Sequence, residues 1–222
     1  MRAYKEMYIA HAADAFGSMM DFAVNDCGLE GDDFLHMFVV SGIAEQFERG
    51  NPKYIAGKSG AELALDTISK TTDKDMRTLP EPGIREYRTP EYWAGWALAQ
   101  YQWFTAMTFA SILRALPFAD IVMMYSTMHE ADITRFYEVA DSVYARENPQ
   151  TNLKRIRMAA GVSQAKLAKE AEVSLRSIQM YEQRKKDINK AQAITLVKLA
   201  RALGQNIEDL LEPTLKNNIQ SY

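Results

Sequence analysis

The chain has 222 residues, of which 47% are hydrophobic and 10% aromatic, enough to bury the core of one or two globular domains. The single Cys27 excludes an internal disulfide and a multi-cysteine zinc site, and the first residues contain no apolar signal segment, which together predict a cytoplasmic protein. The net charge of −3 conceals an asymmetry: residues 151–222 carry 13 Lys and Arg against 7 Asp and Glu, whereas residues 1–150 carry 13 against 22. The basic part suits a polyanion, and the acidic part suits a different partner.

The first third of the chain predicts amphipathic helices. Apolar residues recur at steps of three and four from Tyr4 to about Asn25. Asp32 or Asp33 can cap a second helix, and the tetrapeptide Ser59-Gly60-Ala61-Glu62 has the spacing of a capping box for a third. The three expected helices cover residues 4–25, 32–49 and 59–70.

Residues 71–90 contain three prolines and alternating charges, which predicts an irregular connection. Thr89-Pro90-Glu91 then supplies an N-cap, a first-turn proline and an acid, so a long helix is expected to run to about Leu116. A short helix should follow over residues 118–125. A second capping box, Thr127-Met128-His129-Glu130, predicts a last helix to about Arg146, and Asn148-Pro149 then breaks the chain.

Residues 92–113 carry no charge and are long enough to cross a bilayer. The stretch nevertheless contains glutamine, threonine and serine, which are costly in lipid, and its tryptophans do not form belts at both ends. We therefore expect a buried helix and no membrane partner. The three-four spacing further predicts that Trp93, Trp96 and Phe104 lie mostly inside the N-terminal bundle.

The C-terminal part is organised around residues 163–182. Ser163 and Ser174 each precede an apolar-periodic run as an N-cap, with only Glu172-Val173 to turn the chain between them, so the stretch predicts a helix-turn-helix. Helical spacing places one set of side chains on a shared inner face and leaves another set on the open face of the second helix. The inner set is Leu167, Ala168, Val173, Ile178 and Tyr181, and the open set is Arg176, Ser177, Gln179 and Met180.

The residues Gln164, Leu167-Ala168, Val173-Ser174, Ile178 and Tyr181-Glu182 resemble the phage repressor and Cro type of DNA-binding helix-turn-helix. The resemblance extends from about Asn152 to Leu211, through a first helix around residues 153–157 and last helices over 193–204 and 207–211. It implies that Gln164, Leu175, Arg176 and Met180 approach base edges, and that Arg157 and Glu182 form a buried ion pair. The family often has polar, base-contacting side chains at the positions of Leu175 and Met180. Because these two residues are apolar here, contact with thymine methyl groups is expected for them.

These arguments give one set of expected DNA contacts. Arg176 is the candidate for hydrogen bonds to guanine, and phosphates should be held by Lys185, Lys186, Arg155 and the backbone amides at the two helix starts. The complete predicted DNA-binding set is Gln164, Ser174, Leu175, Arg176, Ser177, Gln179, Met180, Lys185, Lys186 and Arg155. A single module makes few base contacts, so a homodimer on a symmetric double-stranded operator is expected.

Other chemistry finds little support in the sequence. The three histidines are scattered without ligand spacing, and Gly57-Lys58-Ser59-Gly60 lacks the upstream glycine and strand of a phosphate-binding loop. No nucleophile elbow is present. We therefore expect no metal, no cofactor and no enzymatic activity.

The sequence as a whole predicts an all-α protein, with a helical N-terminal domain over residues 1–146 and a five-helix DNA-binding domain over 151–212. The segment Asp33 to Leu63 is rich in glycine and aromatic residues and loosely resembles helical antitoxin domains of bacterial toxin-antitoxin operons. The resemblance implies a toxin partner and autorepression. The other interpretation is an unrelated helical scaffold. An alternative function is a repressor whose N-terminal domain senses a small ligand through Trp93, Trp96, Trp103 and Phe104.

Overall fold

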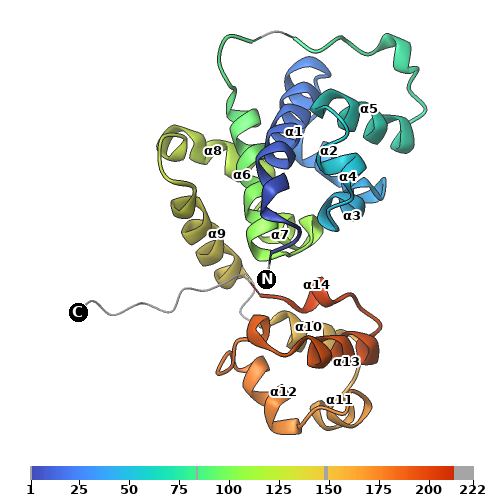
Figure 1. Ribbon diagram of the computed structural model, residues 1–222, viewed down its shortest axis with the longest axis vertical. Coiled ribbons are helices and arrows are strands. Elements are labelled where there is room, and N and C mark those ends of the chain that lie inside the picture. Colours follow the sequence, from blue (N-terminus) through green and yellow to red (C-terminus); the bar gives the residue numbers. More distant parts are fainter. Residues whose placement is uncertain (1, 84, 148–149, 213–222) are drawn as a thin grey trace. The chain divides into compact units, whose positions relative to one another are not determined.

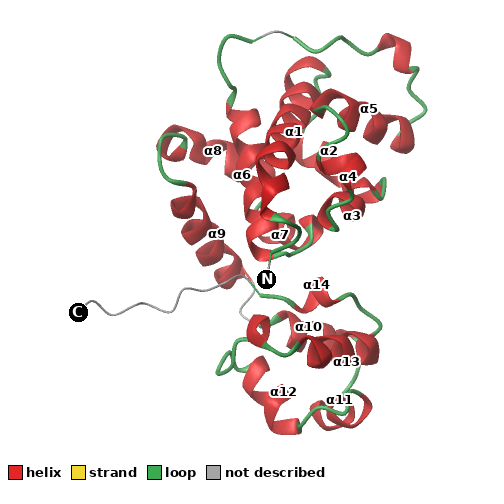
Figure 2. Cartoon of the chain, in the orientation of Figure 1, coloured by secondary structure: helices red, strands yellow, loops and turns green. Residues whose placement is uncertain are grey.

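The computed structural model describes residues 2–83, 85–147 and 150–212, and every regular element among them is a helix (Figures 1 and 2). The protein is therefore all-α, as predicted. The described residues form two compact units, one from Arg2 to Ala140 and the other from Asp141 onward. The division falls inside the continuous helix α9 (Ile133–Glu147), whereas the sequence analysis placed it after residue 146; the Asn148-Pro149 break lies outside the described residues.

The N-terminal unit is a bundle of short helices arranged around α1 and α6 (Figure 1). A 3-10 turn, Glu6–Tyr8, leads into α1, and a π-helical turn, Phe22–Asp26, follows it. The helices before α9 are α1 (Ile9–Asp21), α2 (Gly31–Val40), α3 (Ile43–Glu48), α4 (Pro52–Ile55), α5 (Gly60–Thr71), α6 (Pro90–Thr105), α7 (Phe109–Ala115) and α8 (Phe118–Met128).

Two glycines allow the helices of this unit to approach α1 closely. A Cβ atom on Gly60, the first residue of α5, would lie 2.6 Å from the carbonyl oxygen of Ala15 in α1. A Cβ atom on Gly95, in α6, would lie 2.8 Å from the Met20 side chain. Since real Cβ atoms do not approach other atoms this closely, α1 can sit between α5 and α6 only because these positions lack side chains.

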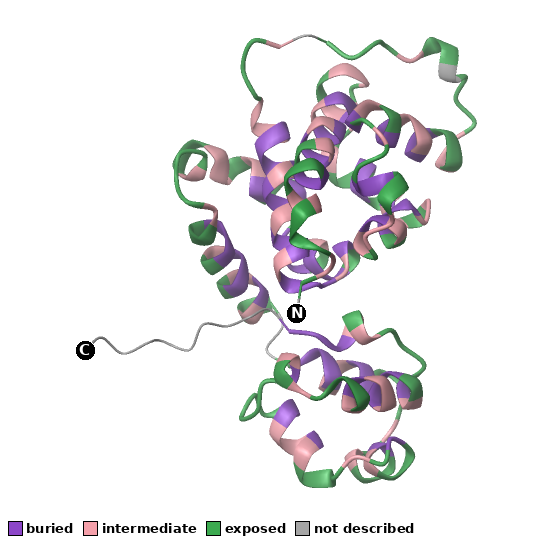
Figure 3. Cartoon of the chain, in the orientation of Figure 1, coloured by how far each residue is buried: buried purple, intermediate pink, exposed green. Residues whose placement is uncertain are grey.

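The core of the N-terminal unit is a cluster of four phenylalanines from four helices, all fully buried. Figure 3 colours the buried positions of the described residues purple. Phe16 on α1 stacks on Phe109 of α7 with ring centroids 4.8 Å apart. Phe38 of α2 and Phe47 of α3 each meet Phe16 edge to face at 5.4 Å. Phe16 therefore joins elements that are distant in the sequence, and its ring holds the cluster together.

The prediction of one long helix from Pro90 to Leu116 is wrong, because the helix ends at Thr105. Ala106 adopts a left-handed φ of 56°, and α7 begins after Thr108, whose side chain accepts a hydrogen bond from the Ser111 N–H. The buried amide of Gln102 donates to the Met107 carbonyl at 3.0 Å. Side chains thus satisfy part of the backbone that the break frees, and neither glycine nor proline is needed to end α6.

Two of the expected caps were also wrong. Asp32 does not cap the second helix; its carboxylate accepts hydrogen bonds from the Phe118 and Ala119 N–H groups, at 2.6 and 3.1 Å, and so caps α8. Thr127 is not a cap either, because α8 continues through Met128 and Thr127 donates to the Met124 carbonyl. The predicted second helix is itself divided into α2 and α3 at Gly42, which has a φ of 76°. The capping box at Ser59 and the cap at Thr89 are present as predicted.

Trp93, Trp96 and Phe104 lie mostly inside the N-terminal unit, as predicted, but to different degrees. Trp93 is 9% exposed, whereas Trp96 and Phe104 are half-buried. The most deeply buried positions of α6 include Ala94, Ala97, Leu98 and Tyr101. Gly95 lets α6 pack closely on α1, whereas Trp96 and Phe104 keep part of their surface exposed.

The charge-free stretch over residues 92–113 is divided between α6 and α7. Among the described residues, no single helix has the length and apolar character needed to span a bilayer. The pair α7 and α8, which are bent by 75° relative to each other, is together long and apolar enough to cross a bilayer, by length and composition only.

The part of the C-terminal unit that the structure describes contains the end of α9 and five further α-helices. Their positions agree with the five predicted from the sequence, and the buried residues Leu153, Leu167, Ile178, Leu196 and Leu199 form its core. The helices are α10 (Asn152–Ala159), α11 (Gln164–Glu170), α12 (Leu175–Glu182), α13 (Ala193–Leu203) and α14 (Ile207–Leu210), with a 3-10 turn at Ile188–Lys190.

The last described residues, Leu211 and Glu212, close the C-terminal unit. Asn152, at the start of α10, donates its side-chain amide to the Leu211 carbonyl at 2.6 Å and its backbone N–H to the Glu212 carboxylate. Glu212 also pairs with Arg184 at 3.1 Å, and its N–H donates to the side chain of Asn189 at 2.9 Å. Burial raises the pKa of Glu212 despite these partners. This segment ties the first helix of the unit to the loop after α12.

Candidate nucleic-acid interface

Helices α11 and α12 form the predicted helix-turn-helix. The Ser163 side chain accepts a hydrogen bond from the Lys166 N–H, and the Ser174 side chain accepts one from the Ser177 N–H. Both serines are therefore N-caps, as predicted. Glu172, in the turn, has a left-handed φ of 49° and a 2.6 Å ion pair with Lys198 of α13.

The structure contains the expected ion pair between Arg157 of α10 and Glu182 of α12. Arg157 donates from Nε and Nη2 to the two carboxylate oxygens at 2.6 and 2.9 Å, and the two side chains are only 11% and 2% exposed. Burial acts to raise the pKa of Glu182, but the hydrogen bonds from Arg157 and Gln164 outweigh burial and hold the pKa below its ordinary value. The pair fixes the start of the helix-turn-helix to its end.

Gln164 is part of the same network. Its Nε2 donates to the Glu182 carboxylate at 2.7 Å, so this side chain, expected at base edges, is tied to the ion pair in the DNA-free chain. Gln164 is half-buried at the first position of α11. Its predicted role therefore requires that its amide contact a base next to a fixed carboxylate.

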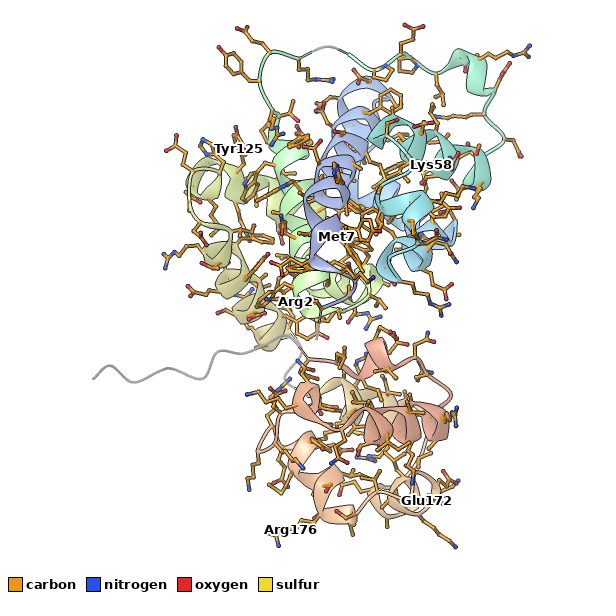
Figure 4. All side chains as sticks on the ribbon, in the orientation of Figure 1. Arg2, Met7, Lys58, Tyr125, Glu172 and Arg176 are labelled. Atoms are coloured by element: carbon orange, nitrogen blue, oxygen red, sulfur yellow. The ribbon has the colours of Figure 1, made fainter. Side chains whose placement is uncertain are left out.

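The open face of α12 carries the other predicted base contacts. Arg176 is exposed and extends away from the C-terminal unit in Figure 4, and Leu175 is 40% exposed. Ser177, Gln179 and Met180 are half-buried beside them, whereas Ile178 and Tyr181 face the core. The Ser177 side chain is held by the hydroxyl of Ser174 at 2.8 Å. A helix with one cation and several uncharged side chains on its open face has the composition of a major-groove reader.

The predicted phosphate contacts are divided between two places. Lys185 and Lys186 are exposed just after α12, where both backbone N–H groups bond to the Met180 carbonyl. Arg155 is instead half-buried on α10, with Nη2 donating to Asn152 at 3.3 Å. The structure therefore brings the two lysines together beside α12, and it places Arg155 with the residues that close the unit.

A polar groove of about 510 Å³ lies between α12 and the start of α13, and sequence reasoning missed part of it. Ser174, Ser177 and Lys186 line one side, and Lys190 and Thr195 contribute from the other. The excess of basic residues after α12 was the available signal, but only the fold shows that Lys190 shares the groove with Lys186. A groove with several lysines and hydroxyl groups suits the phosphate backbone of a nucleic acid.

A second cavity, of about 270 Å³, lies in the N-terminal unit. Of the four aromatic residues expected to line a ligand pocket, Trp93 and Trp96 line it. Trp103 does not, and donates from its indole to the Tyr4 carbonyl at 2.9 Å, while Phe104 stacks on Tyr137. Tyr92 of α6 also lines the cavity, and further rings come from Tyr125 of α8 and Phe136 of α9, which the sequence did not connect with α6.

No curated protein and no solved structure matches the chain. Residues 153–210, which cover α10 to α14, match a family model described as Helix-turn-helix. The C-terminal region is therefore a helix-turn-helix domain of the phage repressor and Cro type.

Proposed function

We propose that this protein is a transcriptional repressor that binds a symmetric operator as a homodimer and reads its sequence with α12. The helix-turn-helix domain indicates DNA binding and transcription regulation. The observation that carries the finer proposal is the open face of α12, where Arg176 is exposed between the caps at Ser174 and the lysines that follow the helix. Two copies on half-sites about one helical turn apart would supply enough contacts for specificity.

Replacing Arg176 and Lys185 in turn should separate base reading from phosphate binding. The guanidinium of Arg176 can hold guanine O6 and N7 together, which contributes about 1 to 3 kcal/mol of discrimination. Arg176→Ala should therefore lose preference for the operator, whereas Lys185→Ala should weaken operator and scrambled DNA about equally and lower the salt slope by about one. The measurement is a salt titration of both variants on both duplexes.

Arg201→Ala is the matched control, because Arg201 is exposed near the end of α13 and does not line the lysine groove. It should keep the wild-type affinity ratio and most of the salt slope. If Arg176→Ala also keeps the wild-type ratio of operator to scrambled affinity, α12 is not the reader.

For the N-terminal unit, the function that we favour is neutralisation of a toxin encoded beside it, with the protein as both antitoxin and autorepressor. The excess of acidic residues in 1–150 supports a basic partner protein. The segment Asp33 to Leu63, which covers α2 to the first turn of α5, offers exposed apolar surface at Val40, 65% exposed. Toxin capture would occur in the cytoplasm and would not require DNA.

Residues 1–146 should bind the product of the adjacent gene without the DNA-binding domain. The charge asymmetry is the physical reason, since a basic partner is attracted to the acidic part and repelled by the basic part. A pull-down with the tagged 1–146 fragment tests this, alongside the full chain carrying Arg176→Ala, which should keep the partner. Binding that requires residues 151–222 would move the partner surface to the helix-turn-helix domain.

One observation favours a second candidate function, the sensing of a small ligand. The N-terminal unit contains the aromatic cavity described above, with rings from α6, α8 and α9 and with an arginine and a histidine among its lining residues. An apolar cavity with few polar groups is the usual form of a small-molecule site. In this function the ligand, instead of a toxin, would set the affinity for the operator.

A further inference from the structure

The aromatic cavity of the N-terminal unit has a lining that restricts what it can bind. Five rings line it, together with the apolar residues Met128, Ala131 and Ile133. The five are Tyr92, Trp93, Trp96, Tyr125 and Phe136. Its volume of about 270 Å³ is slightly below the ~300 to 1,000 Å³ of sites for drug-sized ligands. The cavity therefore suits a compact ligand of one ring or two fused rings.

The rings are arranged to receive a flat molecule. Trp93 meets Tyr125 at a centroid distance of 5.9 Å and an angle of 71°, and it meets Phe136 at 5.9 Å and 76°. At these distances Trp93 touches both rings, so a guest would lie beside them, where perpendicular rings present a face and an edge to the cavity. An aromatic guest can stack on one ring and meet another edge to face, the two arrangements that aromatic pairs prefer.

Among the described residues that line the cavity, Arg88 is the permanently charged side chain, and it forms an ion pair with Asp14. Arg88 stacks its guanidinium on Tyr92, 4.4 Å from the ring centroid, and contacts Asp14 through Nη2 at 3.0 Å. The side chain of Arg88 is 67% exposed, so this cation lies at the mouth of the cavity and keeps further N–H donors directed to the solvent side. Among the described residues that line the cavity, none is an aspartate or a glutamate.

His129, at the end of α8, adds a second polar group to the cavity, near Tyr125 (Figure 4). Its ring stacks on Tyr125 at 4.4 Å, and its Nδ1 lies 2.8 Å from the Tyr125 carbonyl oxygen, which fixes the proton on Nδ1. The Nε2 atom lies 3.7 Å from the Glu130 carboxylate. The lining therefore offers one permanent cation, Arg88, and one oriented imidazole.

We propose that this cavity binds a compact planar aromatic acid, with its ring among Trp93, Trp96 and Tyr125 and its acidic group on Arg88. The assignment deepens the ligand-sensing function and rests on it. A carboxylate gains charge-assisted hydrogen bonds from a guanidinium, which can hold both oxygens at once. An ammonium ligand would meet the same guanidinium as a repelling charge, although aromatic rings alone would accept it.

The test compares an acid with its uncharged isostere on the full-length protein, without DNA. Indole-3-carboxylate and indole-3-carboxamide have the same ring and nearly the same shape. Titration calorimetry should show the carboxylate binding at least ten-fold more tightly than the amide. Arg88→Gln should remove that difference by weakening the carboxylate alone, whereas Trp96→Ala should weaken both ligands. Arg77→Gln is the control, because Arg77 is an exposed arginine in the same connecting segment and should change neither affinity.

Three results would overturn the assignment: equal affinity for acid and amide, no binding of either, or tighter binding of tryptamine than of the carboxylate. An unchanged acid preference in Arg88→Gln would do the same. These outcomes leave the operator experiments untouched, because they involve no DNA. Conversely, an acid that binds through Arg88 but does not alter operator affinity would support the site and refute the sensing function.

Discussion

Replacing Arg157 with methionine should destabilise the helix-turn-helix domain by about 3 to 5 kcal/mol, because it leaves the Glu182 carboxylate, 2% exposed, without its cation. A domain of this size is expected to have a total stability of roughly 4 to 10 kcal/mol. The variant should therefore lose about a third of it or more. Urea unfolding followed by circular dichroism measures the change. All three tryptophans lie outside this domain, so their emission should keep its native value at urea concentrations that unfold only this domain.

Two further variants show whether the stranded charge is the cause. Arg157→Met combined with Glu182→Leu should recover most of the loss, since apolar residues can replace a buried pair without leaving a charge. Glu172→Gln, which breaks the exposed pair with Lys198, should leave the midpoint nearly unchanged. If Arg157→Met unfolds at the wild-type urea concentration, the pair does not hold α10 to α12.

The same pair predicts a dependence on pH. The pKa of Glu182 is lowered in the folded protein, so its contribution to stability is complete above the ordinary value of 4.5 and is lost as the pH falls through the folded value. In Arg157→Met the carboxyl group is buried without its cation, which favours its protonated form. The difference in stability between wild type and variant should consequently be smaller at pH 4 than at pH 7.

Phe16→Ala should destabilise the N-terminal unit by about 3 to 5 kcal/mol, the usual cost of removing a buried phenylalanine. Phe16 is fully buried and contacts the rings of Phe38, Phe47 and Phe109, so its removal leaves a cavity where three other helices meet. In a unit of this size the expected fall in Tm is ~6 to 20 °C. Thermal unfolding followed by tryptophan emission reports it, because Trp93, Trp96 and Trp103 all belong to this unit.

Met123→Ala is the matched comparison for Phe16→Ala. Met123 is 72% exposed on α8, and its truncation should change stability by less than ~0.5 kcal/mol. If Phe16→Ala has the same Tm as Met123→Ala, the phenylalanine cluster is not the core of the N-terminal unit.

The sequence predicted those parts of the fold that local chemistry determines. Ser59, Thr89, Ser163 and Ser174 cap helices where they were expected, because an N-cap needs only a side chain and the N–H groups two or three residues later. The five helices of the DNA-binding domain were found by the same local signals and by resemblance to a known family. The ion pair between Arg157 and Glu182 could be expected from that resemblance and from the crossing of the first and third helices that lets Ile156 and Ile178 share a core.

The elements that the sequence did not predict depend on contacts between distant residues. Asp32 could cap its own helix by spacing, but it lies beside the first turn of α8, 86 residues away along the chain, and caps that instead. Ala106 ends α6 without glycine or proline, because Gln102 and Thr108 bond to the backbone around it. Trp96 fits the buried stripe of α6 but is only half-buried, because periodicity does not show how far each position on one face is covered by other helices.

The candidate sites also include one that local spacing predicts and two that depend on contacts between distant residues. The open face of α12 follows from helical spacing, so Arg176 could be chosen from the sequence, although its contact with a base stays a prediction. The lysine groove needs the loop after α12 folded against α13, and the aromatic cavity needs α8 and α9 beside α6. Spacing along one helix cannot show which residues of another helix complete a cavity.

The contacts of Leu211 and Glu212 also determine when the DNA-binding domain can fold during synthesis. Asn152 at the start of α10 is held by residues about 60 positions later, so the closing hydrogen bonds cannot form until Glu212 has left the ribosome. Synthesis proceeds at ~5 to 20 residues per second, and helix formation is far faster. The N-terminal unit can therefore bury its phenylalanine cluster seconds before the last hydrogen bonds of the helix-turn-helix domain can form.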